Sequence, residues 1–260
     1  MSRGRLDLGE QYKTADGKLR TSSMSYLYDI AEGNIAKHLP EVKYGRNPDV
    51  GTSEETVWDQ GGLYTYQSAA VTLYASSSDA GDTHEITVKG LDANWEKQEQ
   101  TVTLTGQTQV EIGTSKTWIR CFRAYNSSAD ASDGDIYIAE TDTLTGGVPD
   151  TASKIKAKIT QGREQTLMAL WTVPANSTAY IVNVFASGDS SKATQVGLYI
   201  REEGGVFRIQ GTIDLLGTGI DVPQEIPRVY PEKTDIEMRA TAGQTGGAVS
   251  SRLSLWYETD

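Results

Sequence analysis

After about residue 66, apolar and polar residues alternate along the chain with a period of two. This pattern is typical of antiparallel strands that bury one face and expose the other. In the run 84–89, for example, Ile86 and Val88 share one face, and Glu85 and Thr87 share the opposite one. The alternating runs of this first block are 69–75, 84–89, 99–105, 108–113, 116–125 and 134–140.

Two of these runs, 84–89 and 99–105, predict a hairpin. Gly90, Asp92 and Asn94 in the connection are turn-forming residues. Trp95 lies in the same connection, and we expect it to fold back over one sheet edge, because buried tryptophan is common. An exposed tryptophan that binds a ligand is the alternative interpretation.

A second block with the same period follows. Residues 165–173 are apolar on both faces, which predicts a central strand buried from both sides. At the C-terminus, Leu253, Leu255 and Tyr257 alternate with polar residues, so we expect this segment to be tied into a sheet. The runs of this block are 154–160, 165–173, 173–187, 196–212, 233–242 and 252–260.

Residues 1–65 lack the strand period. A short helix is expected within 22–40, and Pro40 should end it. The apolar residues at helical spacing are Met24, Leu27, Ala31 and Ile35. A segment of this length without a core of its own is expected to pack on something else. Spaced aromatic residues favour such a docked arm over disorder, namely Tyr12, Tyr26, Tyr28, Tyr44 and Trp58.

The best candidate boundary is 143–153, which combines Gly-Gly, a Val-Pro step and small polar residues. We therefore predict an N-terminal arm (1–65), a β-sandwich domain (66–142), a linker (143–153) and a second β-sandwich or jelly-roll domain (154–260). The predicted fold class is all-β, with at most a short helix. A parallel sheet is not expected, because helical segments between the strands are lacking.

Composition agrees with this prediction. The 260 residues are 37% hydrophobic and include 26 glycines but only 3 phenylalanines. The net charge is −11, which disfavours binding to nucleic acid or to an anionic membrane. The N-terminus has no apolar core, and no apolar run reaches the length of a membrane span, so we expect a soluble chain made without an export signal.

The residues that carry chemistry are few. Cys121 is the only cysteine, and its strand-like surroundings predict a small buried hydrophobe. His38 and His84 are the only histidines, and they lack zinc spacing or a nearby nucleophile motif. The Gly-rich stretches lack the context of a phosphate loop. We therefore predict no catalytic, cofactor-binding or metal-binding residue, and no enzymatic activity.

Two chemical alternatives remain open. Asp130, Asp133 and Asp135 gather before a strand, and calcium favours such oxygen clusters. Their spacing differs from the EF-hand loop, so an acidic solvated loop is the simpler interpretation. A carboxylate pair of a glycosidase is the other alternative, since spatial pairs cannot be read from a sequence.

Three stretches resemble structural proteins of tailed bacteriophages, of a type frequent in marine phages. They are residues 45–66, 86–110 and 136–182, and their most specific parts are GRNPDV, GLDANW and TLTGGVPDTASKI. The resemblance covers roughly residues 45–185 and carries over no functional residue. It implies a non-enzymatic, β-rich virion component that is present in many symmetric copies.

We therefore expect a capsid decoration, fibre-type or head–tail accessory protein whose arm docks on a neighbour. Its expected partners are other copies of itself, as a trimer, and the major capsid protein. Side chains of the arm, namely Met24, Leu27, Tyr28 and Trp58, should be covered only in the assembly. The alternative is a tail adhesin that binds glycan through an exposed aromatic cluster at one tip, including Trp95 or Trp171.

Overall fold

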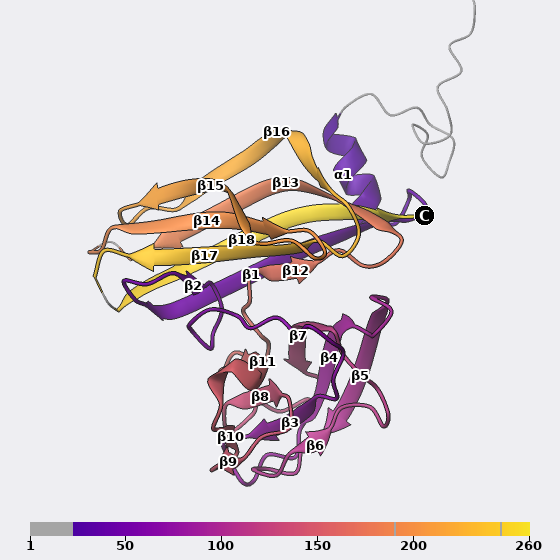
Figure 1. The fold of residues 1–260 in the computed structure, drawn as a ribbon, viewed down its shortest axis with the longest axis vertical. Coiled ribbons are helices and arrows are strands. Elements are labelled where there is room, and N and C mark those ends of the chain that lie inside the picture. The colour runs from indigo at the N-terminus through magenta and orange to yellow at the C-terminus, as the bar shows by residue number, and fades with distance from the viewer. Residues whose placement is uncertain (1–22, 190, 245) are drawn as a thin grey trace, which may run out of the picture.

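The computed structural model describes residues 23–189, 191–244 and 246–260, and it confirms an all-β protein (Figure 1). Apart from one short hairpin, the strands form four antiparallel sheets, which we number 1 to 4. In Figure 1, sheets 1 and 2 make the upper part of the molecule, with helix α1 (Ser23–Ala31) at one end, and sheets 3 and 4 make the lower part.

Sheet 1 holds the C-terminus of the chain. Its strands, in spatial order, are β1 (His38–Val50), β18 (Gly247–Thr259), β13 (Ser177–Gly188) and β16 (Ile220–Tyr230). Leu253, Leu255 and Tyr257 of β18 point inward and are buried, as the alternating pattern predicts. The expectation that the C-terminal segment is tied into a sheet is confirmed, because β18 pairs with β1 on one side and β13 on the other.

In sheet 2, the strand predicted from residues 165–173 lies at the edge and not at the centre. Its order is β12 (Leu170–Thr172), β17 (Asp235–Ala242), β14 (Thr194–Arg201) and β15 (Arg208–Leu215), and β2 (Glu55–Thr56) also pairs with β17. Strand β12 is buried on both faces as predicted, but the prediction that it lies at the centre of its sheet is wrong. Other sheets cover it instead: the Trp171 ring centroid lies 6.4 Å from that of Phe122 in sheet 4 and 5.3 Å from that of Tyr257.

Sheets 3 and 4 form the lower part. Sheet 3 has the order β11 (Ile155–Ile159), β8 (Ile136–Ala139), β3 (Tyr74–Ser77) and β6 (Val110–Glu111). Sheet 4 has the order β5 (Lys97–Thr103), β4 (Glu85–Leu91) and β7 (Arg120–Asn126). The antiparallel pairing of β4 with β5 confirms the hairpin predicted from the sequence.

The segment expected to be a linker, 143–153, lies between two strands of one sheet. It contains the hairpin of β9 (Leu144–Thr145) and β10 (Val148–Pro149) and the start of the 3-10 turn η2 (Ala152–Lys154), and it leads from β8 to its partner β11. Gly146 and Gly147 are part of the predicted boundary, but both have positive φ and close this tight hairpin. A strand of the expected second block therefore completes a sheet of the first. The grouping of the strands into separate domains stays a prediction.

Strand β1 corrects the expectation that residues 38–65 belong to an arm without strand structure. Its inward positions carry Lys43, Gly45 and Asn47, and its outward positions carry Val42 and Tyr44, which are 45% and 55% exposed. Strand β1 thus buries polar residues and exposes apolar ones, the reverse of the usual pattern. The buried polar side chains are tolerated because they form hydrogen bonds within the protein. Lys43 donates to the carbonyl of Phe122, and Asn47 donates to Glu55. A search for buried apolar positions therefore misses this strand.

The predicted burial of arm side chains only in an assembly is wrong for Trp58. Its side chain is 3% exposed within the single chain, packs against Tyr64 and donates Nε1–H to the carbonyl of Gly62. Helix α1 confirms the expected short helix but ends at Ala31, and its exposed residues include Leu27 and Tyr28. Residues 1–22 and the side chain of Met24 lie outside the described residues.

One cluster of buried apolar side chains runs through all four sheets. Trp118 and Trp171 are the largest fully buried side chains in it, and Cys121 is buried as predicted. Burial raises the pKa of the Cys121 thiol to about 12, so this side chain acts as a small hydrophobe. The upper and lower parts therefore share one continuous core.

Candidate assembly surface and other candidate sites

A group of exposed apolar side chains lies on and beside β15 and β16. We call it the β15–β16 patch, and it comprises Val206, Ile209, Leu216, Ile220, Ile226 and Val229. Both strands are edge strands, since β15 pairs only with β14 and β16 pairs only with β13 among the described residues. Exposed apolar side chains on unpaired edges are typical of surfaces that associate with another chain.

Strand β16 contains a large bulge that projects Ile226 into solvent. Pro223 stands opposite Asn183 and Arg228 opposite Ile181, so the segment 224–227 faces the single residue Val182. Ile226 lies in this bulge and is 85% exposed. Proline cannot donate to a ladder, and Pro223 and Pro227 hide this strand from a sequence-based search for alternation.

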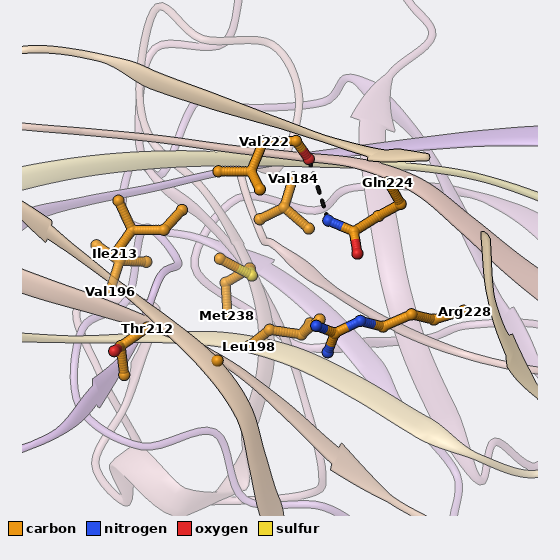
Figure 2. Close-up of a pocket in the computed structure, with 10 residues that line it drawn as sticks. Val184, Val196, Leu198, Thr212, Ile213, Val222, Gln224, Arg228 and Met238 are labelled. Atoms are coloured by element: carbon orange, nitrogen blue, oxygen red, sulfur yellow. Dashed lines mark hydrogen bonds between the residues drawn. The ribbon is translucent and has the colours of Figure 1, made fainter. Parts of the chain in front are cut away.

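Between the two edge strands lies an apolar cavity of about 190 Å³ (Figure 2). Its lining comes from β13 and β16 of sheet 1 and from β14, β15 and β17 of sheet 2, so the two sheets face each other across it. Arg228 Nη1 donates to the carbonyl of Gln210 at 3.1 Å and ties the two edges together. The apolar lining side chains are Val184, Val196, Leu198, Ile213, Val222 and Met238. This lining suits an aliphatic group.

The two histidines are not brought together. His38 stacks on Trp256 with ring centroids 5.1 Å apart, and its Nε2 lies 3.4 Å from a carboxylate oxygen of Glu258. His84 lies in the lower part, where its Nδ1 is 3.3 Å from a carboxylate oxygen of the buried Asp82. Each ring has its own local partners, in different parts of the molecule.

The acidic loop has partners within the protein. Asp135 forms an ion pair with Lys158 at 2.8 Å and accepts a hydrogen bond from the backbone N–H of Gln161. Burial alone would raise the pKa of Asp135, but the hydrogen bonds from Lys158 and Gln161 lower it below its ordinary value. Across residues 23–260, leaving out 190 and 245, no group of three His, Cys, Asp or Glu side chains could hold a metal ion.

The tryptophans proposed for glycan binding lie in covered positions. Trp171 is 0% exposed. Trp95 is half-buried and packs on the core, and the guanidinium of Arg120 lies 4.7 Å from its ring centroid. Trp95 has a left-handed φ of 64°, held by a turn in which the Asp92 carboxylate accepts backbone N–H groups of Asn94 and Glu96. These positions favour the interpretation of Trp95 as a lid.

Two buried carboxylates, Asp235 and Glu237, belong to one ion network with arginines. Asp235 on β17 receives Arg120 Nε of β7 at 2.7 Å and Arg201 Nη2 of β14 at 2.6 Å. Glu237, two residues further on, is fully buried beside Arg239, and burial raises its pKa above the ordinary value. Both carboxylates are therefore committed to arginines within the fold, and the network joins the lower part to sheet 2.

No model of a known protein family matches the chain, and no curated protein matches it. Among solved structures, a mitogen derived from Yersinia pseudotuberculosis is similar over 33% of this chain and 80% of its own, with 9% identity and a TM-score of 0.21. Infectious bursal disease virus Gx strain is similar over 85% and 77%, with 12% identity and a TM-score of 0.21. The VP2 subviral particle of the same virus covers 86% and 77%, with 12% identity and a TM-score of 0.20. These TM-scores are too low to support an inference about function.

In the part of the chain that the structure describes, no helix combines the length and apolar character that a membrane span needs.

Proposed function

We propose that this protein is a non-enzymatic structural component of a phage virion and that it assembles with other copies of itself through the β15–β16 patch. The patch is the observation that carries the proposal. The resemblance of residues 45–185 to structural proteins of tailed bacteriophages supports the virion as the proposed location. The trimer and the contact with a major capsid protein belong to the same proposal.

The patch suits a second copy of this chain. The chain has 35 acidic and 24 basic residues, whereas the segment 206–230 holds three acidic residues and two arginines, so repulsion between copies is weak here. Arg208 and Glu225 are exposed and belong to no ion pair of the described chain, and each can pair with its counterpart on a neighbour. Ile226 of one copy can enter the apolar cavity of the next copy. Such a head-to-tail contact generates a closed ring when the rotation between copies closes.

Mass measurement by multi-angle light scattering on the full chain tests the assembly. We expect a trimer of three times 28.3 kDa, and we expect Ile226→Glu to weaken association about tenfold or more, as for a central apolar contact. The matched control is Leu63→Glu, which places the same charge on an exposed apolar residue outside the patch. A monomeric mass at high concentration, or equal weakening of association by both variants, contradicts assembly through the β15–β16 patch. Immunogold labelling of purified particles tests the location, and unlabelled particles contradict it.

A further inference from the structure

A second cavity, of about 390 Å³, lies where sheet 4 meets β1. It is open to solvent, because Lys97, Glu99 and Arg123 in its wall are exposed. The charged residues of the wall are Glu41, Lys89, Lys97, Glu99 and Arg123. Strands β1, β4, β5 and β7 supply these residues, so the cavity forms only when the upper and lower parts are packed together.

The wall holds three cations and two carboxylates, and within the described part of the chain only one of the cations is paired with a carboxylate. Lys89 is paired with Glu99 at 2.9 Å. Lys97 and Arg123 have no carboxylate within 4.0 Å among the described residues. Lys97 instead donates to the hydroxyl of Tyr257 and lies 4.6 Å from its ring centroid, and Arg123 donates to the Gln165 side chain at 3.3 Å. Both retain N–H donors that can reach a ligand.

Besides Lys97 and Arg123, a third cation without a carboxylate partner in the described chain, Lys43, lies next to the wall. Lys43 is 4% exposed, and its amine donates to the carbonyl of Phe122, whose ring centroid is 5.2 Å away. Burial lowers the pKa of Lys43 to about 8; Glu41 opposes this shift, and Arg123 and Lys97 add to it. Glu41, Lys97 and Arg123 line the cavity, and Lys43 contacts Phe122 in its wall, so the three cations and Glu41 lie around one cavity. In a chain with a net charge of −11, this is a local excess of positive charge.

We propose that this cavity binds a small oxyanion carrying carboxylate or phosphate groups, with Lys97 and Arg123 as its direct ligands. A bound oxyanion would accept charge-assisted hydrogen bonds from both side chains and relieve the repulsion among the three cations. The planar guanidinium of arginine can donate two parallel hydrogen bonds to a carboxylate or a phosphate, and lysine supplies a point charge. This site is independent of the β15–β16 patch and of the proposed assembly.

Calorimetric titration of the full chain with inorganic phosphate and with citrate tests the site, at constant ionic strength set with chloride. We expect saturable binding of at least one probe, and the tighter of the two identifies phosphate or carboxylate as the preferred group. Lys97→Gln and Arg123→Gln should each weaken binding roughly three- to tenfold, since each removes one charge-assisted contact. Glu41→Gln should tighten it by a similar factor, because it removes the opposing carboxylate.

The matched control is Lys116→Gln, which removes the charge of an exposed lysine that does not line the cavity. The proposal is overturned if titration with phosphate and with citrate releases no more heat than titration with chloride. It is also overturned if the variants at Lys97 and Arg123 bind the probes like the unaltered chain. Circular dichroism of each variant confirms that it is folded. If Lys116→Gln weakens binding as much as Lys97→Gln, the effect is general screening and the site is refuted.

Discussion

At the residue scale, Lys43 shows how far a buried side chain can depart from the hydrophobic pattern. Its ammonium group is surrounded by protein and held by one carbonyl and one aromatic ring. Removing a charge from water costs free energy unless partners compensate, and here the cost appears as a lowered pKa. The sequence could not predict this burial, because the accepting carbonyl of Phe122 lies 79 positions away. The burial of Cys121, by contrast, followed from its apolar neighbours in sequence.

Lys43 should make stability depend on pH. Because its pKa is about 8 in the folded chain and 10.5 in the unfolded chain, the unfolded chain binds more protons between these values, and stability rises with pH across this window. The cost below pH 8 is on the order of 3 kcal/mol, at about 1.4 kcal/mol per pKa unit. Urea unfolding of Lys43→Met and of the unaltered chain at pH 7.5, 9 and 10.5 measures it. The stability difference between them should shift by that amount in favour of the unaltered chain as pH rises. A difference that stays constant with pH would show that Lys43 is not desolvated.

At the element scale, prediction from the sequence succeeded where strands bury apolar residues and expose polar ones. The β4–β5 hairpin and β18 follow this rule. Strand β1 was missed because its inward positions are Lys43, Gly45 and Asn47. Strand β16 was missed because prolines interrupt it and most of its side chains are exposed. The β15–β16 patch therefore has half of its residues on a strand that alternation cannot reveal.

Gly45 gives a test of the packing of β1. A Cβ added there would lie 2.2 Å from the carbonyl oxygen of Val57 and 2.4 Å from the backbone N of Ala169, and backbone atoms cannot easily move aside. We expect Gly45→Ala to destabilise the chain by about 1–3 kcal/mol or more, as overpacking does. Gly211→Ala on β15 is the matched control, because no atom lies within 4 Å of its added Cβ. Urea unfolding midpoints compare the two. If the midpoint of Gly45→Ala equals that of the control, β1 does not pack against these segments.

At the scale of the whole molecule, strand partners depend on contacts between distant segments. Alternation in residues 154–160 predicts a strand, but it cannot show that β11 pairs with β8 across the expected linker. The same limit applies to β2, whose partner β17 lies nearly at the other end of the chain. The composition predicted the all-β class, whereas the arrangement into four sheets around a shared core came only from the structure.

The shared core predicts a single unfolding transition. Trp171 contacts sheets 1 and 4, and the buried Arg120–Asp235 pair crosses from β7 to β17, so neither part can unfold without exposing groups of the other. Tryptophan fluorescence and far-ultraviolet circular dichroism should therefore give the same urea midpoint. Arg120→Met should lower both midpoints together, because it leaves the buried Asp235 with one arginine fewer. Two separated transitions, or a shift in only one of them, would show that the upper and lower parts fold as independent domains.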